Sequence, residues 1–300
     1  MIRKFNKVIF VPAGNGGKYP HCHSLFVDDD VKVLIDPASD QKRLEALKRE
    51  KGVDVIINSH YHEDHFMYNY LFPDAELYVP KADAPCFQSL DKLLEFYGTL
   101  STALEEDWRK YMKDMFNFRE RIPSREFVDG ETFNFGTTIV EIVHTPGHTP
   151  GHSCLFFKEE ELLFLADIDL TPFGPWYGDA SSNLEQTIAS IKLIRDFPAR
   201  TFITAHGEGI VQGGLAKKAD EFLRVIEQRE NALLDFLREP RSMEEIVKKW
   251  IIYKKPREPV KFYEFGERGM IMKHVDRLLK RGAIVFQDGR YERRNTNVCS

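Results

Sequence analysis

The sequence predicts an α+β protein with a β-rich body, a helical insertion and a small C-terminal module. Short β-rich runs alternate with turns over the first 80 residues, whereas residues 83–122 carry apolar stripes at helical spacing. The balance of acidic and basic residues also differs between two parts of the chain. Residues 1–222 have 24 Lys and Arg against 35 Asp and Glu, and residues 223–300 have 18 against 12. Because 300 residues suit two domains, we expect a body over 1–222 and a basic module over 223–300.

Composition excludes several classes of protein. With 42% hydrophobic and 12% aromatic residues the chain can bury a full core, which excludes wholesale disorder. No apolar run approaches the about 18 residues of a membrane span, and Val8–Val11 is too short for the core of a secretory signal. Cys22, Cys86, Cys154 and Cys299 lack the spacing of a disulfide scaffold or a thiolate zinc site. We therefore expect a soluble, reduced protein of the cytoplasm.

Hydrophobic periodicity and turn residues define the elements of the body. Strands are predicted at Lys7–Val11, Ser24–Val27, Val31–Ile35, Val53–Ile57, Thr138–His144, Ser153–Phe157, Leu162–Ala166 and Thr201–Thr204. Helices are predicted at Gln41–Lys51, with Ser39 as its cap, at Leu184–Asp196 and from about Leu215 to Arg238.

Residues 83–122 predict a helical hairpin inserted into the body. Its two stripes, Cys86–Tyr97 and Leu104–Met115, are separated by Gly98 and followed by Pro123. Large apolar residues such as Trp108 give it more apolar surface than packing on one sheet needs. A lid over an apolar substrate would use this surface, and so would an interface with a second copy of the chain.

The C-terminal module predicts two helices and a hairpin. Ser242 caps a helix over Met243–Trp250, and a second helix runs roughly over Glu267–Lys280. Ala283–Gln287 and Arg290–Arg293 flank Asp288-Gly289, which is typical of a type I′ turn. This order is typical of a winged helix, although other small α+β modules share it.

The strongest chemical signal is the run His60-Tyr61-His62-Glu63-Asp64-His65, just after the strand Val53–Ile57. Three imidazoles and a carboxylate in six residues can point into one small volume at the end of a strand. Without a metal, each buried neutral ring would need both a donor and an acceptor. Imidazole and carboxylate together suit Zn, Fe, Mn or Co, so the run predicts a metal site.

Further potential ligands stand where turns follow strands. His144, His148 and His152 are four residues apart, but two Pro-Gly turns keep them off a shared helix face. Asp167 follows the strand Leu162–Ala166, and His206 follows the next strand and precedes Gly207. We interpret His144 and His152 as structural neighbours of the site.

With its H-x-H-x-D-H run, a later TPGH histidine, an Asp after a strand and a final His before Gly, the chain resembles the metallo-β-lactamase fold superfamily. The motifs stand in the family's order over roughly residues 5–210. The resemblance implies an αββα sandwich with the site at one edge. Ala166 stands where the family usually has Gly before the Asp, a change of one methyl group.

Carried over residue by residue, the resemblance implies two divalent metal ions. His60, His62 and His148 would bind the first ion, Asp64, His65 and His206 the second, and Asp167 would bridge both. Metal ions about 3.5–4 Å apart share a water and lower its pKa, which makes a bridging hydroxide the expected nucleophile. Asp64 would orient that hydroxide and relay its proton. We expect Zn, with Fe or Mn as alternatives.

Several residues around these motifs are also candidates for a role at the site, and some have alternative interpretations. Asp36 matches the family's buried Asp near the metal centre, where it would hold a ligand, and a simple turn role is the alternative. Asp169 is expected as a turn carboxylate and His274 as a surface residue. The substrate pocket is expected to include His23, Trp108, Trp176 and Tyr177. For the pair Trp176-Tyr177 a place in the core is an equal alternative.

These features predict a dinuclear metal hydrolase that uses the bridging hydroxide on a small ester, thioester or lactone-like molecule. The alternative is a phosphodiesterase or endoribonuclease, because the two-part arrangement also resembles the β-lactamase-like-2 group through Gln228-Arg229-Glu230 and residues 269–281. A ligand-sensing DNA-binding protein is a third hypothesis. Basic residues spread round the helix Glu267–Lys280 do not favour nucleic acid as a partner. A homodimer through the helical insertion is the other partner we expect.

Overall fold

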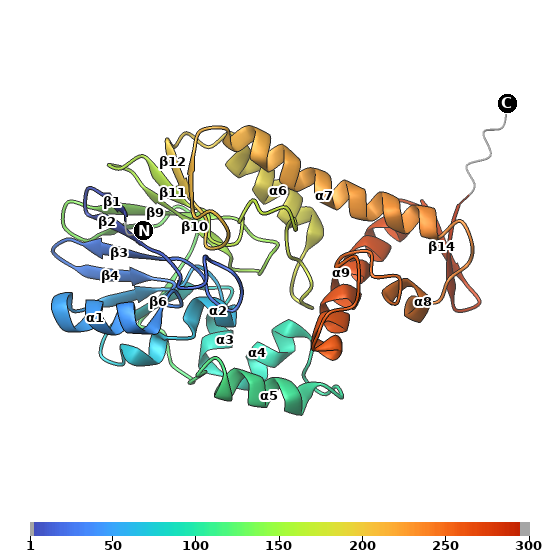
Figure 1. Cartoon of the computed structure of the whole chain (residues 1–300), viewed down its shortest axis with the longest axis horizontal. Coiled ribbons are helices and arrows are strands. Elements are labelled where there is room, and N and C mark those ends of the chain that lie inside the picture. Colours follow the sequence, from blue (N-terminus) through green and yellow to red (C-terminus); the bar gives the residue numbers. More distant parts are fainter. Residues whose placement is uncertain (1–2, 295–300) are drawn as a thin grey trace.

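The computed structural model describes residues 3–294 of the chain. Two β-sheets lie face to face in one half of the molecule, with helices on their outer faces (Figure 1). The long helix α7 (Leu215–Phe236) runs from this body to the C-terminal helices and the last hairpin. The layers of the body are therefore helix, sheet, sheet and helix, which confirms the predicted αββα sandwich.

The first sheet has seven strands in the order β1 to β7. Neighbours from β1 to β4 are antiparallel, and those from β4 to β7 are parallel. The strands are β1 Arg3–Phe5, β2 Val8–Val11, β3 Ser24–Asp28, β4 Lys32–Ile35, β5 Val55–Ile57, β6 Glu76–Pro80 and β7 Arg125–Phe127. All of β5 is buried, as is usual for a parallel strand covered on both faces.

The second sheet has six strands in the order β13-β12-β11-β10-β9-β8. Its strands are β8 Thr132–Asn134, β9 Ile139–His144, β10 Ser153–Phe157, β11 Leu162–Phe164, β12 Thr201–Ile203 and β13 Ile210–Gln212. The ends of β9, β11 and β12 lie at one edge, because β9 and β11 are both antiparallel to β10 and β12 is parallel to β11. Ser153 N donates to Ser59 O at this edge and links it to the end of β5.

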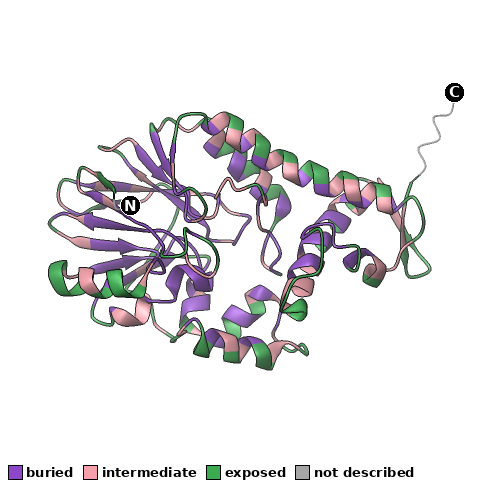
Figure 2. Cartoon of the chain, viewed as in Figure 1, coloured by how far each residue is buried: buried purple, intermediate pink, exposed green. Residues whose placement is uncertain are grey.

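Successive side chains of a strand point to opposite faces of its sheet, and this alternation divides the core into layers. In β11, Leu162 and Phe164 belong to the core between the sheets, whereas Leu163 packs with residues of α6 (Leu184–Arg195) and α7. Helix α1 (Gln41–Lys51) packs on the first sheet through Leu44. Buried residues follow the strands and exposed ones the outer helix faces (Figure 2).

The cap of α1 corrects one prediction. The Asp40 side chain accepts a hydrogen bond from Arg43 N at 3.0 Å, so Asp40 is the cap and the choice of Ser39 was wrong. Ser39 is buried one residue earlier. Both residue types suit the position, and only the backbone path decides between them.

The insertion is helical, but its first helix is divided. Ser89 has an extended backbone and caps a new helix, which separates α3 (Ala84–Gln88) from α4 (Leu90–Tyr97). Gly98, in the left-handed region, ends α4, and α5 (Glu105–Asp114) follows. The apolar residues Trp108 and Phe116 are buried within the chain itself.

The C-terminal segment contains the two predicted helices and the hairpin with shifted bounds. Helix α8 is Met243–Val247 and stops short of Trp250, which has a positive φ. Helix α9 begins at Val260, seven residues before the predicted start, and ends at Lys280 as expected. Strands β14 (Ile284–Gln287) and β15 (Arg290–Arg293) pair around Asp288 and Gly289, which both have positive φ. The winged-helix interpretation and the division at residue 222 stay predictions, and α7 crosses that division without a break.

Two short elements complete the body: α2 (Glu63–Phe66) and the 3₁₀ helix η1 (Asn69–Leu71). Cys22, Cys86 and Cys154 are buried free thiols, and Cys299 lies outside the described residues. Within residues 3–294, no helix combines the length and the apolar character that a membrane crossing requires.

Candidate metal centre

The predicted ligands come from four segments that meet at one edge of the two sheets. The run His60–His65 follows β5, His148 lies between β9 and β10, Asp167 follows β11, and His206 follows β12. The structure gathers them into two groups that could hold metal ions: His60, His62, His148 and Asp167 in one, and Asp64, His65 and His206 in the other. Within each group the ligand atoms lie within 4.8 Å of one another.

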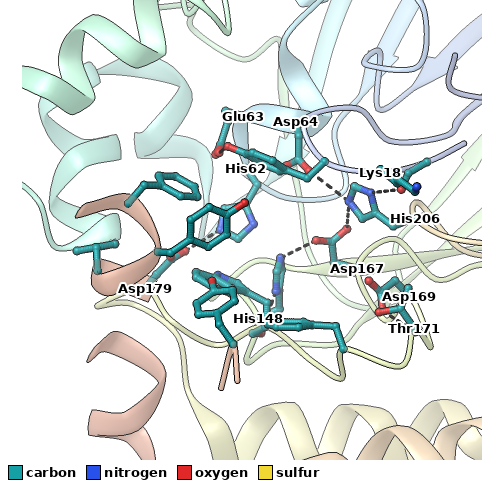
Figure 3. Close-up of a pocket in the computed structure, with 18 of the residues that line it drawn as sticks. Lys18, His62, Glu63, Asp64, His148, Asp167, Asp169, Thr171, Asp179 and His206 are labelled. Atoms are coloured by element: carbon teal, nitrogen blue, oxygen red, sulfur yellow. Dashed lines mark hydrogen bonds and ion pairs between the residues drawn. The ribbon is translucent and has the colours of Figure 1, made fainter. Parts of the chain in front are cut away.

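Asp167 lies between the two groups (Figure 3). Its Oδ2 is 3.1 Å from His148 Nε2 and 3.9 Å from His60 Nε2. Its Oδ1 is 2.8 Å from His65 Nε2 and 3.4 Å from His206 Nε2. Each carboxylate oxygen thus faces one group, which is the arrangement that a ligand shared by two metal ions needs.

The donor set leaves buried atoms unsatisfied. Among residues 3–294, neither His65 Nε2 nor Asp167 Oδ1 has a hydrogen bond of acceptable geometry, although both atoms are buried and lie 2.8 Å from each other. His60 Nε2 and His148 Nε2 lie only 3.2 Å apart. Unpaired buried polar atoms cost free energy, and imidazole and carboxylate are ligands of divalent Zn, Fe and Mn. The residues therefore fit divalent metal ions.

Two carboxylates each contact one ring nitrogen of a predicted ligand histidine, His65 or His62. Asp36 Oδ2 is 2.8 Å from His65 Nδ1, and the same carboxylate accepts hydrogen bonds from Ser59 N and Ser59 Oγ. Asp179 Oδ2 is 2.6 Å from His62 Nε2. Partners of this kind fix the tautomer and the orientation of a metal-binding imidazole. Asp36 therefore has the supporting contact that the resemblance implied.

Asp179 also sets which nitrogen of His62 faces the metal site. Burial disfavours the charged imidazole, but the Asp179 carboxylate outweighs it and raises the pKa of His62 to about 9. Tyr61 Oη donates to the same carboxylate oxygen at 2.6 Å. Because Nε2 of His62 is engaged with Asp179, Nδ1 is the atom left for a metal ion.

The other ligands are held by backbone and hydroxyl groups. His148 Nδ1 lies 3.1 Å from the carbonyl oxygen of Trp176, and His206 Nδ1 lies 3.1 Å from that of Gly17. His60 Nδ1 lies 2.9 Å from Ser59 Oγ. Each of the five predicted histidine ligands therefore has one ring nitrogen engaged outside the centre.

His152 and His144 have the structural contacts that we expected. Asp167 N donates to His152 Nε2 at 3.1 Å, so His152 fixes the backbone of Asp167. His144 Nε2 lies 2.9 Å from the carbonyl oxygen of Pro150 and shapes the loop that carries His148. Asp169 accepts a hydrogen bond from Thr171 N at 2.9 Å, as a turn carboxylate does.

Asp83 is a supporting residue that sequence reasoning missed. Its carboxylate accepts hydrogen bonds from Gly151 N, Thr149 Oγ1 and Tyr61 N, and so joins the loop of His148 to the His60–His65 run. Burial raises the pKa of Asp83 to about 7, against the effect of these hydrogen bonds. Asp83 and Asp179 belong to no motif, and only their contacts in the folded chain identify them.

Glu63 joins two segments above the centre. Its carboxylate is 4% exposed and accepts hydrogen bonds from Tyr19 Oη, at 2.7 Å, and from Tyr97 Oη. Burial raises the pKa of Glu63. Tyr19 belongs to the N-terminal loop and Tyr97 to α4, so this one carboxylate fixes both segments over the site.

A cavity of about 500 Å³ opens above the two groups. Its floor includes predicted ligands, and its walls come from the insertion, the loop after Asp167 and the C-terminal segment. The wall residues include Tyr97, Trp108, Phe173, Trp176, Tyr253, Arg257, Phe262, Tyr263 and Phe265. A concave, mostly apolar space above polar groups is typical of a small-molecule site.

Two of the four predicted pocket residues, Trp108 and Trp176, line this cavity. His23 does not, because it is buried beneath the floor, where it accepts a hydrogen bond from Ala13 N at 2.9 Å. Tyr177 is fully buried, and its hydroxyl is 2.9 Å from Nε2 of His274. His274 is buried too, which corrects the surface prediction. Adjacent residues of an extended loop face opposite sides, so Trp176 faces the cavity and Tyr177 the core.

The fold and the site define a protein of the metallo-β-lactamase type. The chain matches the Metallo-beta-lactamase superfamily over residues 20–206 and belongs to it. A crystal structure of a metallo-beta-lactamase family protein from Thermus thermophilus has a TM-score of 0.72 at 22% identity, covering 96% of this chain and 99% of that one. The shared fold thus extends into the C-terminal segment.

Two curated relatives are hydroxyacylglutathione hydrolases. The protein from Rhizobium johnstonii is 39% identical over 71 residues, which are 23% of this chain and 28% of that protein. The protein from Francisella philomiragia is 25% identical over 171 residues, which are 56% of this chain and 54% of that protein. The chain therefore spans between about a quarter and about half of the length of these relatives.

Proposed function

We propose that the chain is a dinuclear metal-dependent hydrolase of a small thioester, ester or lactone-like molecule. The observation that carries the proposal is the carboxylate of Asp167, whose two oxygens face two groups of imidazole and carboxylate ligands. Both groups lie at the floor of one cavity. Membership of the Metallo-beta-lactamase superfamily supports this assignment.

The residues of the site have different roles in the proposed hydrolysis. Divalent ions held by the two groups would supply Lewis-acid activation of the substrate carbonyl and of water. Asp64, at the cavity floor with Oδ2 3.3 Å from His206 Nε2, is the carboxylate to which we assign the proton of the attacking water. Asp36 and Asp179 keep His65 and His62 in place while negative charge develops on the carbonyl oxygen of the substrate.

Thioesters are the first substrates to test. An acylglutathione is a thioester, and hydroxyacylglutathione hydrolases are among the relatives. A cavity of about 500 Å³ suits a small molecule. Its walls come from the helical insertion, the loop after Asp167 and the C-terminal segment.

The phosphodiesterase or endoribonuclease alternative has less support, because basic residues in α9 and at its C-terminal cap are engaged within the chain. Arg277 Nε lies 3.0 Å from Glu185 and 3.5 Å from Glu230. Arg281 also pairs with Glu230, at 3.3 Å, and Lys273 Nζ donates to the carbonyl of Ala180 at 3.0 Å. These contacts use charge that a nucleic-acid surface would present to phosphates.

Turnover of a substrate panel by metal-replete protein tests the proposal. The panel contains acyl thioesters, a lactone and bis-p-nitrophenyl phosphate, and we expect a thioester to have the highest kcat/KM. Asp64→Asn removes the proton acceptor and should lower kcat by about 100-fold or more. Preferred turnover of the phosphodiester, or an Asp64→Asn variant with unchanged kcat, would overturn the assignment.

A further inference from the structure

The outer half of the cavity is built by segments outside the catalytic motifs. Trp108 comes from the helical insertion, and Tyr253, Phe262 and Phe265 come from the C-terminal segment. The superfamily match ends at residue 206, so these C-terminal walls are outside the part of the chain that the family model matches.

One wall is a continuous series of aromatic contacts that begins at a predicted ligand. The ring of Tyr97 stacks on His62, with centroids 5.6 Å apart and planes 14° apart. Trp108 lies 4.8 Å from Tyr97 and stacks on Phe262 at 5.7 Å and 25°. Phe265 meets Trp108 edge to face at 5.4 Å. Because the hydroxyl of Tyr97 is bonded to Glu63, the base of this wall is fixed.

Another aromatic wall of the same cavity comes from the loop after Asp167. Phe173 and Trp176 line it, and the Phe173 ring lies 5.5 Å from that of Tyr253. The buried guanidinium of Arg229 donates to the carbonyls of Phe173 and Pro175 and holds this loop. Both aromatic walls are therefore set before a ligand arrives, which lowers the cost of binding a flat group between them.

Polar groups are concentrated on the floor. The carboxylates and imidazoles of the lining belong mainly to the metal centre and its support, such as Asp64, His148 and Asp179. The upper walls present aromatic faces, which pair well with the rings of a ligand. The lining also includes the cationic side chains of Lys18 and Arg257, which can donate hydrogen bonds to a polar part of the substrate.

We propose that the acyl group of the substrate is aromatic, with its ring or rings between the Trp108–Phe262 wall and the Phe173–Tyr253 wall and its carbonyl toward the metal centre. This inference rests on the proposed function. It makes Trp108 and Phe262 specificity-determining residues, and it gives the C-terminal segment the task of selecting the acyl group.

Thioesters that share one leaving group isolate the acyl preference. The full-length, metal-replete protein is assayed with the acetyl, hexanoyl, benzoyl and 2-naphthoyl thioesters of N-acetylcysteamine. We expect kcat/KM for the two aromatic thioesters to exceed that for acetyl by about tenfold or more. Phe262→Ala and Trp108→Ala should lose most of this preference, measured as the ratio of kcat/KM for the 2-naphthoyl thioester to that for the acetyl thioester. Phe262→Leu, which retains bulk without a ring, covers the case in which the alanine variant fails to fold.

Phe286→Ala is the matched control, since Phe286 lies on β14, is 54% exposed and does not line the cavity. It should keep the aromatic preference. Equal kcat/KM for hexanoyl and naphthoyl thioesters, or a preference unchanged in Phe262→Ala and Phe262→Leu, would overturn the inference while the hydrolase assignment stands.

Binding of 2-naphthoate separates this inference from the proposed function, because it needs no turnover. Trp108 and Trp176 line the cavity, so their fluorescence should fall as naphthoate binds. Saturable quenching that weakens about tenfold in Phe262→Leu supports the aromatic site even if no thioester is hydrolysed. Absence of quenching in the wild-type protein contradicts it even if acetyl thioester is turned over.

Discussion

The carbonyl oxygen of Trp176 lies 3.1 Å from Nδ1 of His148, so a residue of the cavity wall also orients a predicted metal ligand. The loop that carries Trp176 is held in turn by Arg229, which is 1% exposed. Its guanidinium donates to the carbonyls of Phe173 and Pro175 and to Tyr177 Oη. The long helix α7, which carries Arg229, is thus connected to the metal centre through one loop.

Arg229→Met should destabilise the protein and weaken metal binding at the three-histidine group. The variant leaves the buried carbonyl of Pro175 and the partly buried carbonyl of Phe173 without their donor, and an unsatisfied buried acceptor costs about 1–3 kcal/mol. We expect a lower midpoint in chemical unfolding and a lower metal content after dialysis. Arg238→Met is the control, because the Arg238 side chain is 70% exposed. Arg229→Met with wild-type stability and metal content would show that the loop holds His148 without this anchor.

Gly269→Ala should disrupt the docking of α9 on the loop next to the cavity. A Cβ at position 269 would lie 1.9 Å from the carbonyl oxygen of Gly178, so the two backbones would have to separate. Alanine favours a helix over glycine by about 1 kcal/mol, but overpacking of this kind costs about 1–3 kcal/mol or more. We expect a net loss of stability by thermal unfolding. Met272→Ala, at a 46% exposed position of the same helix, should be close to neutral, and a more stable Gly269→Ala would refute the close contact.

Asp29 should make stability depend on acid pH. Burial opposes its ionisation, but hydrogen bonds from Thr137 and Thr138 outweigh burial and hold the pKa of Asp29 well below its ordinary value. A pKa that is lower in the folded than in the unfolded chain gives stability above about pH 4, and this stability is lost as the pH falls toward the folded pKa. Asp29→Asn should therefore lower the free energy of unfolding at pH 7 by about 1.5–3 kcal/mol. The difference from wild type should shrink at acid pH.

Chemical unfolding at pH 7 and at about pH 2.5, below the ordinary pKa of Asp, measures this difference. Asp114→Asn serves as the control, since Asp114 is exposed on α5. A difference between wild type and Asp29→Asn that grows as the pH falls would contradict the assignment.

Substitution of the shared carboxylate should affect both metal ions. His148→Ala removes a ligand from one group only, whereas Asp167→Ala removes the carboxylate that faces both. Elemental analysis after metal-supplemented expression should give about one ion per chain for His148→Ala and less for Asp167→Ala, against about two for the wild type. Wild-type metal content in Asp167→Ala would disprove the bridging role.

The elements that the sequence predicts well are those with a clear hydrophobic pattern and clear turn residues at their ends. The strand Ser153–Phe157 and the helix Gln41–Lys51 match the structure at both ends, because hydrophobic pattern and turn residues mark them. β7 (Arg125–Phe127) and β13 (Ile210–Gln212) were missed, since three residues carry no period and only their sheet partners make them strands. The start of α9 was missed because apolar residues such as Phe262 and Phe265 turn toward the insertion in place of the module's own core.

The site, like the fold, has one part that sequence patterns predict and another that they do not. Spacing and resemblance identified every residue of the two groups. Asp83, Asp179 and Arg229 act through contacts with chain segments far away in sequence, which no local pattern encodes. His23 and Tyr177 were misplaced because the sequence does not show which side of a loop faces the cavity.

The most direct test of the central claim is a metal titration of thioesterase activity. Protein stripped of metal by a chelator is titrated with Zn²⁺ while hydrolysis of an N-acetylcysteamine thioester is followed. Activity should be near zero without metal and should rise to a plateau at about two ions per chain. Full activity in the stripped protein, or no thioester hydrolysis at any metal loading, would contradict a dinuclear hydrolase at this site.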